Sequence, residues 1–113
     1  MTEQATSTPP SLIRLHHASV VLQLLATHPE LAAAPIDWEI NDRDSGLWAR
    51  VKYGIPESES AARKLAAALN AKVIVDDVSG RPLYSVYGTW HGTEVNLQAF
   101  GPAASDTAEA VTA

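Results

Sequence analysis

Residues 83–100 read LYSVYGTWHGTEVNLQAF, and this stretch decides the fold expected for the chain. Two segments of alternating polarity flank His91-Gly92, a dipeptide suited to a two-residue hairpin loop. Folding the segments back around that loop sets Tyr84, Val86, Gly88 and Trp90 opposite Ala99, Leu97, Val95 and Thr93, and sets Ser85, Tyr87 and Thr89 opposite Gln98, Asn96 and Glu94. One face of the hairpin is then apolar and the other polar, which predicts a sheet that is covered on one side.

Two shorter segments upstream alternate in the same way and predict two more strands. Residues 36–41 form the first, with Ile36, Trp38 and Ile40 pointing inward. Residues 42–46 have turn composition. Residues 47–53 form the second strand, whose expected inward side chains are Leu47, Ala49, Val51 and Tyr53.

Two segments have the period of an α-helix. Residues 11–27 are expected to form the first helix, with Ser11 as its N-cap and with Pro29 limiting its end. The second, over residues 57–71, is rich in alanine. The expected buried positions are Leu12, Leu15, Ala18, Leu22 and Leu25 on the first helix and Ala62, Leu65, Ala66 and Leu69 on the second.

Residues 72–78 complete the pattern with a strand that is apolar on both faces, which favours either a central position in the sheet or extra cover. The order α-β-β-α-β-β-β predicts an α+β fold, with a mainly antiparallel sheet and two helices packed on one face. A single domain is expected over residues 11–100, between disordered tails at 1–10 and 101–113 that lack large apolar blocks.

The composition excludes several classes of protein. The 113 residues contain no cysteine, which rules out disulfides, thiolate metal sites and a cysteine nucleophile. The formal net charge of −5 argues against a nonspecific nucleic-acid binder, which needs a basic face. No apolar run reaches transmembrane length and the start lacks a signal-peptide pattern, so a cytoplasmic location is expected.

No residue pattern identifies a catalytic, cofactor or metal site. His16 and His17 are adjacent on the predicted helix, so their side chains diverge by about 100°. Asp76 and Asp77 are adjacent on a predicted strand and point to opposite faces. The chain also lacks a G-x-S-x-G motif and a glycine-rich phosphate loop. We therefore expect no enzyme activity, no metal and no cofactor.

Trp48 and Tyr87 are the strongest candidates for a contact surface. Both are out of phase with the apolar side chains of their strands, which places two aromatic rings on the polar face of the sheet. Aromatic residues on a polar face are typical of protein interfaces. The plainer alternative is a half-exposed Trp48 stacked on Arg50 or Lys52.

The first helix carries more apolar residues than one sheet face covers. Ile13, Val20 and Leu24 lie beyond its expected buried stripe. A symmetric dimer that pairs this surplus with its own copy is the simplest way to cover it. The alternative is that Leu31 and its neighbours fold back over these residues.

Some of these features resemble a group of short uncharacterised proteins of actinobacteria that are often associated with prophages or other mobile elements. The shared features are the His-Pro-Glu-Leu turn at 28–31, the Ile-Asp-Trp-Glu-Ile segment at 36–40, the alanine-rich second helix and the hairpin with Trp90-His91-Gly92. The resemblance implies an accessory role without a known activity, and it transfers no functional residues.

Three candidate functions remain open for this chain. The first is a small non-enzymatic protein-binding or regulatory accessory module that acts on an unidentified protein partner. The second is a small-ligand-binding domain with a cleft between helices and sheet, for which the candidates are Tyr84, His16 and His17. The third is a nucleic-acid accessory protein, which requires one face to carry Arg50, Lys52, Arg63, Lys64 and Lys72.

Overall fold

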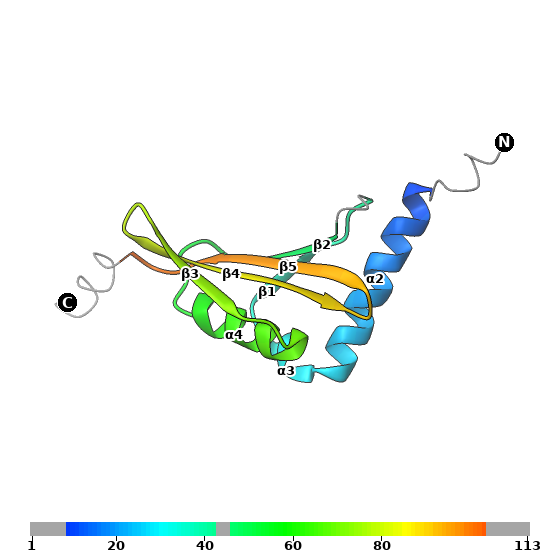
Figure 1. Cartoon of the computed structure of the whole chain (residues 1–113), viewed down its shortest axis with the longest axis horizontal. Helices are drawn as coiled ribbons and strands as arrows, with labels where there is room; N and C mark the ends of the chain where they lie inside the picture. The colour runs from blue at the N-terminus through cyan, green and yellow to red at the C-terminus, as the bar shows by residue number, and fades with distance from the viewer. Residues whose placement is uncertain (1–8, 43–45, 104–113) are drawn as a thin grey trace.

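The computed structural model describes residues 9–42 and 46–103, and Figure 1 shows their arrangement. The elements follow one another as α2 (Pro10–Thr27), α3 (Pro29–Ala33), β1 (Ile36–Glu39), β2 (Leu47–Val51), α4 (Ser58–Leu69), β3 (Val73–Val78), β4 (Arg81–Trp90) and β5 (Thr93–Phe100). The predicted α+β class is confirmed, with α3 as an additional short helix. Most of the predicted tails and of the 42–46 turn lies outside the described residues, at 1–8, 104–113 and 43–45. Pro10, expected in the N-terminal tail, is instead the first residue of α2.

The β4–β5 hairpin has the predicted register, in which Val86 pairs with Leu97 and Gly88 with Val95. Its loop residues His91 and Gly92 have φ angles of 49° and 86°. Positive φ at both positions matches the right-handed twist of the strands, as in a type I′ turn. The sequence therefore identified the two strands that lie next to each other in the middle of the sheet.

The five strands form one sheet in the order β1-β2-β5-β4-β3. Every pair is antiparallel except β2–β5, which runs parallel with Leu47 beside Val95 and Ala49 beside Leu97. An antiparallel sheet was expected throughout most of the fold, and this one pair departs from it. The segment that contains α4, β3 and β4 separates β2 from β5, and this long connection permits the parallel direction.

Helix α4 packs across β4 and β5 on one face of the sheet. Its small residues Ala62 and Ala66 let the helix approach closely, and Asn70 ends it in the left-handed region at φ 53°. The core between helix and sheet contains the predicted residues Ala62, Leu65, Ala66, Leu69, Val86, Val95, Leu97 and Ala99 together with Leu47, Ala49, Val51 and Ile36 of the first two strands. Ala61, which was not predicted, is buried with them.

Helix α2 was expected to pack on the same face as α4, but it crosses the end of the sheet instead (Figure 1). Its buried residues are His17, Val20 and Leu24, whereas Leu12, Leu15 and Leu22 are exposed. The predicted stripe is therefore wrong except at Leu25, which packs against the core. The helix is turned so that Val20 and Leu24, expected to be surplus, are buried. The helix is apolar on most sides, so its periodicity alone did not determine which side faces inward. None of the helices in residues 9–42 and 46–103 is both long and apolar enough to cross a membrane.

Two further expectations about strands are wrong. Strand β3 lies at the edge of the sheet, not at its centre, and its Ile74 and Val75 are exposed on opposite faces. Strands β1 and β2 end at Glu39 and Val51, so Ile40 and Tyr53 leave the strand alternation and are exposed as well. Side-chain alternation holds only where the backbone stays paired.

The hairpin register is tested by two neighbouring residues of β5. Leu97→Ala is expected to lower the free energy of unfolding by about 2–5 kcal/mol, because Leu97 is fully buried between α4 and the sheet. Gln98→Ala, on the opposite face, is expected to cost less than about 0.5 kcal/mol. Chemical denaturation of both variants measures the difference, and equal effects would contradict the register.

Gly88 provides a test of the contact between helix and sheet. A Cβ at this position would lie 3.0 Å from Leu69 Cβ and 3.3 Å from Ala71 Cβ. We expect Gly88→Ala to destabilise the protein by about 1–3 kcal/mol through overpacking. In a double-mutant cycle with Leu69→Gly, the combined loss should be smaller than the sum of the single losses, since glycine removes both Leu69 atoms nearest to the added Cβ, namely Cβ at 3.0 Å and Cδ1 at 3.1 Å. Additive losses would show that the contact is not close.

Candidate functional site

The side of the sheet opposite α4 is here called the open sheet face. Figure 1 shows α4 and α3 beneath the sheet and no described helix above it. Strand alternation and register place on this face Glu39, Trp48, Arg50, Ser85, Tyr87, Asn96, Gln98 and Phe100. The face is therefore a mixed polar and aromatic surface.

Trp48 and Tyr87 lie on either side of Asn96 in one row of this face. Trp48 pairs with Asn96 across β2–β5, and Asn96 pairs with Tyr87 across β5–β4. Neighbouring strands are about 4.8 Å apart, so both rings flank the amide closely. Gly46 also lies against the amide, since an added Cβ there would be 3.3 Å from Asn96 Nδ2. Together these neighbours leave Asn96 only 6% exposed on a face that no described helix covers. The prediction that Trp48 and Tyr87 share a face is confirmed, and Tyr87 keeps 49% of its surface exposed.

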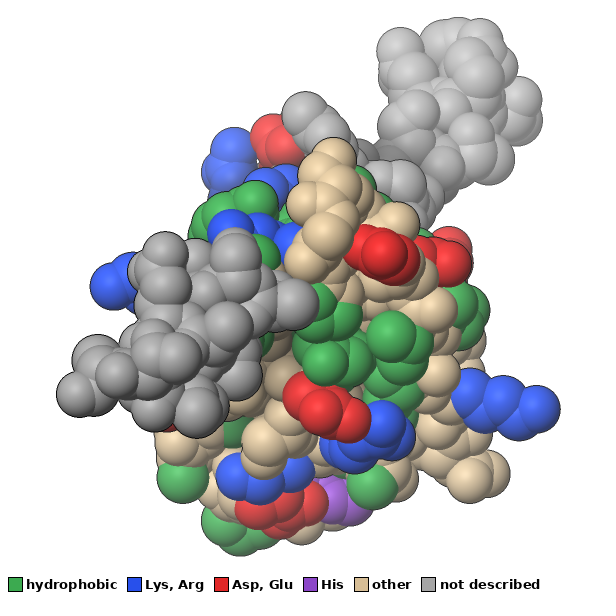
Figure 2. All heavy atoms as spheres, turned by 90° about the vertical axis from the view of Figure 1, so that its left-hand side faces the viewer, with side chains coloured by type: hydrophobic (Ala, Val, Ile, Leu, Met, Phe, Trp, Pro, Cys, Tyr) green, Lys and Arg blue, Asp and Glu red, His purple; other side chains and the backbone are tan. Residues whose placement is uncertain are grey.

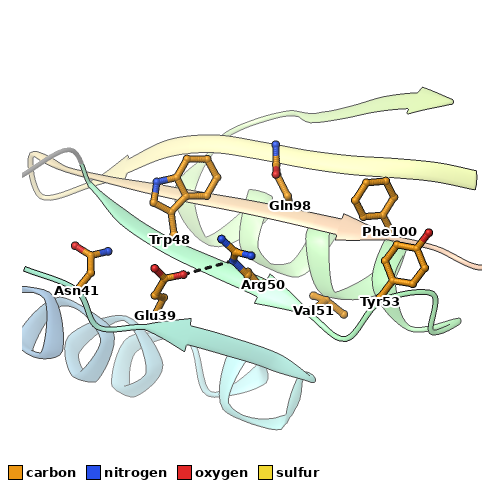
Figure 3. Close-up of a pocket in the computed structure, with 8 residues that line it drawn as sticks. All are labelled: Glu39, Asn41, Trp48, Arg50, Val51, Tyr53, Gln98 and Phe100. Carbon is orange, nitrogen blue, oxygen red and sulfur yellow. Dashed lines mark ion pairs between the residues drawn. The ribbon is translucent and has the colours of Figure 1, made fainter. Parts of the chain in front are cut away.

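A hollow of about 500 Å³ lies next to this row (Figure 3). Figure 3 shows the ring of Trp48 towards one end of the hollow and the rings of Tyr53 and Phe100 towards the other, with Arg50 between them. The centroids of the Tyr53 and Phe100 rings are 5.2 Å apart. The remaining lining residues are Glu39, Asn41, Val51 and Gln98.

The charged groups of the hollow are largely paired. Arg50 Nε lies 3.4 Å from a carboxylate oxygen of Glu39, and both side chains are well exposed. An exposed ion pair of this kind contributes little to stability, about 0–1 kcal/mol. The Arg81 guanidinium lies 4.7 Å from the centre of the Tyr53 ring, a distance typical of a cation–π contact. The hollow therefore has an aromatic wall and no concentrated charge of one sign.

The three residues proposed for a cleft between helix and sheet are not brought together. His16 and His17 line a smaller hollow of about 230 Å³ between α2 and the hairpin loop. Tyr84 lies six residues before Trp90 on β4, which is about 20 Å along a strand. The space beside the histidines is smaller than the roughly 300–1,000 Å³ of ordinary ligand sites.

Both histidines make hydrogen bonds that hold the fold together. His17 is buried and its Nδ1 donates to the backbone carbonyl of Asn41 over 2.9 Å. His16 Nε2 lies 2.7 Å from Thr93 Oγ1. These contacts attach α2 to the segment after β1 and to the start of β5. The structure thus gives the histidines a positional role.

Residues 9–42 and 46–103 contain no cluster of three or more histidine, aspartate or glutamate side chains that could hold a metal ion. Burial raises the pKa of the Tyr84 phenol, and the nearby Glu59 carboxylate raises it further, against a smaller lowering by Arg63. A raised pKa keeps Tyr84 protonated at neutral pH, which does not suit a base or a nucleophile.

The basic residues do not share one face. Arg50 lies on the open sheet face, whereas Arg63 and Lys64 belong to α4 in the opposite layer. Arg63 is also paired with Glu59 at 2.6 Å. On the end of the molecule shown in Figure 2, side chains of both charge signs are interspersed. The electrostatic pattern of a nucleic-acid binder is not present there.

The remaining predicted interface residues are on α2, away from the open sheet face. Val20 and Leu24 are core residues and Ile13 is half-buried, so they do not form the exposed patch that was expected. Conversely, the sequence did not indicate that Tyr53, Phe100 and Asn96 join Trp48. Tyr53 was assigned inward, and the place of Asn96 beside Trp48 depends on the parallel β2–β5 pair.

The chain was compared with protein-family models, with curated proteins and with solved structures, and no match was found in any of the three. The residues of the surface itself are therefore what indicates a function for this chain.

The raised pKa of Tyr84 predicts a pH dependence of stability. The folded chain holds the phenolic proton to higher pH than the unfolded chain, whose tyrosine titrates near pH 10.0. The stabilisation from this group is complete below that pH and is lost as the pH rises through the raised pKa. Denaturation measured from pH 9 to 11.5 should show a decline in stability that is less steep in Tyr84→Phe. An unchanged slope in that variant would contradict the assignment.

Proposed function

We propose that this protein is a small non-enzymatic protein-binding or regulatory accessory module that engages a partner through the open sheet face. The observation that supports this most directly is the row formed by Trp48, Asn96 and Tyr87 on a sheet face that no described helix covers. An aromatic pair on such a face provides a large contact area with few rotatable bonds.

The surroundings of the row fit the usual anatomy of an interface. Aromatic side chains and arginine are enriched at the centres of protein interfaces, and polar groups form their rims. Here Trp48 and Tyr87 are central, whereas Glu39, Arg50 and Gln98 are exposed polar neighbours. The rim can exchange its water for hydrogen bonds with a partner, and the rings supply the apolar area.

The size of the face indicates the kind of partner. Five strands at about 4.8 Å and six residues at about 3.3 Å give a plane of roughly 24 by 20 Å, or about 480 Å². A standard interface buries about 800 Å² on each side. The open sheet face therefore suits a short segment of a partner or a transient complex, and a larger contact would have to extend beyond it.

A small ligand in the hollow beside the row is the second candidate function. Its volume falls within the range of ordinary ligand sites, and the Tyr53 and Phe100 rings form an apolar wall. This hollow lies on the open sheet face, not between helices and sheet as was first expected. The ion pair of Glu39 and Arg50 is well exposed, which favours a protein segment over a tightly enclosed ligand. A nucleic-acid role is the least supported, because the basic residues lie in different layers.

Capture of partners from the native host tests the proposal. Wild type, a Trp48→Ser/Tyr87→Ser variant and a Leu15→Ser/Leu22→Ser variant would each be immobilised, and bound proteins quantified by mass spectrometry. The second pair is the control, since Leu15 and Leu22 are exposed apolar residues on α2, away from the open sheet face. We expect a specific partner to fall about tenfold or more in the sheet variant, as removal of two interface aromatics predicts, and to persist in the helix variant. Loss in the helix variant alone would contradict the proposal.

A further inference from the structure

Strand β3 leaves one edge of the sheet unprotected. It is six residues long, and Ile74, Val75 and Val78 are 47%, 53% and 41% exposed. The other edge strand, β1, has four residues and follows Pro35, features that protect a sheet edge from further pairing. A longer edge with exposed β-branched side chains on both faces is a surface on which another strand can pair.

The register of the β3–β4 hairpin determines which backbone groups point outward. Its two-residue loop, Ser79-Gly80, has φ angles of 55° and 78°, and Val78 pairs with Arg81. The residues that close such a loop form a hydrogen-bonded pair, and inward and outward backbone groups then alternate along the strand. The N–H and C=O of Val73 and Val75 therefore point away from the sheet.

The sequence of this edge is complementary to itself. Residues 72–76 read Lys-Val-Ile-Val-Asp, a palindrome of apolar residues with opposite charges at its two ends. When two copies run antiparallel about a two-fold axis at Ile74, each Lys72 lies opposite Asp76 of the other copy. Val73 then lies opposite Val75, which is a hydrogen-bonded pair, as the outward groups require. Neither Lys72 nor Asp76 makes an ion pair with any other described residue.

Neighbouring registers fit less well. Moving the two-fold axis by one residue shifts the pairing of the two strands by two residues. Only such two-residue shifts keep the outward N–H and C=O groups of one copy opposite those of the other. Moving the axis to Val75 sets Ile74 opposite Asp76 and Val73 opposite Asp77. Asp77 also accepts a hydrogen bond from the Gly80 N–H and so belongs to the turn. Moving the axis to Val73 sets Lys72 opposite Ile74. The charge pattern thus selects the register centred on Ile74.

We propose that a second copy of this chain pairs with β3 in this register. The two five-stranded sheets then join into one continuous sheet, and the strand edge of each copy is covered by the other. The side chains of Lys72, Ile74 and Asp76 share the face that carries Tyr87, so the open sheet faces of both copies are continuous across the axis. This inference is independent of the proposed partner binding.

Charge-reversed variants test the pairing by sedimentation equilibrium. Lys72→Glu places acids at both ends of the palindrome, and Asp76→Lys places bases at both ends. Each variant alone sets like charges opposite each other twice, so its dimer should be about tenfold or more weaker than that of wild type. An equimolar mixture of the two should recover the dimer, since each acid then faces a base. Lys64→Glu, the same charge change on α4, should leave association unchanged.

Backbone pairing is tested separately. Amide hydrogen exchange followed by NMR should show that Val73 and Val75 become protected as protein concentration rises, while Ile74 and Asp76 are protected throughout by β4. Val75→Pro removes one outward N–H that the monomer does not use, so it should abolish dimerisation and keep the monomer folded by circular dichroism.

Three results would overturn the proposal. The first is a wild-type monomer at high micromolar concentration. The second is a dimer that neither charge variant weakens. The third is a dimer that Leu15→Ser/Leu22→Ser dissociates and Val75→Pro leaves intact, which would assign association to the exposed leucines of α2.

Discussion

The pairing of β4 with β5 is the constraint on which the rest of the structure depends. These are the two longest strands, and they occupy adjacent inner positions of the sheet. Their loop residues His91 and Gly92 hold positive φ angles, and this turn geometry fixes the pairing register of the two strands. A slip of one residue would move the side chains of one strand to the other face of the sheet. Once Val86, Val95 and Leu97 share one face, α4 has a surface to cover, and the outer edges of the hairpin receive β3 and β2.

The parallel contact between β2 and β5 converts this framework into a candidate site. It sets Trp48 beside Asn96, so that Trp48 and Tyr87 flank Asn96 from the two neighbouring strands. It also brings the end of β5 near the segment after β2, where the Tyr53 and Phe100 rings are in contact. The same contact carries β1 to the far edge, where Glu39 pairs with Arg50. A surface with aromatic rings and paired charges arises from side chains that are distant in sequence and are joined only by sheet pairing.

Helix α4 covers only one face of the sheet, and this explains which surfaces of the molecule remain available for association. Helix α4 lies over β4 and β5, and α2 crosses the sheet end, so the described elements leave one face and the β3 edge uncovered. A domain of this size buries only about 60–65% of its unfolded surface, and a partner that covers more adds to its stability by mass action. The uncovered face is mixed in polarity, whereas the uncovered edge is apolar with a charge at each end. For this reason we propose different partners for the two, a foreign segment on the face and an identical strand at the edge.

The sequence by itself determined the elements whose patterns are local. Alternation around His91-Gly92 identified the hairpin and its register, and helix period with Pro29 identified the extent of α2, because both depend on residues a few positions apart. The place of Trp48 and Tyr87 on one face followed from the same alternation. Only the tertiary structure decided that β2 runs parallel to β5, that β3 is an edge and that α2 turns Val20 and Leu24 inward. The sequence of a strand that is apolar on both faces does not distinguish a central position in the sheet from an edge position. A helix that is apolar on all sides has no preferred buried side until another element contacts it.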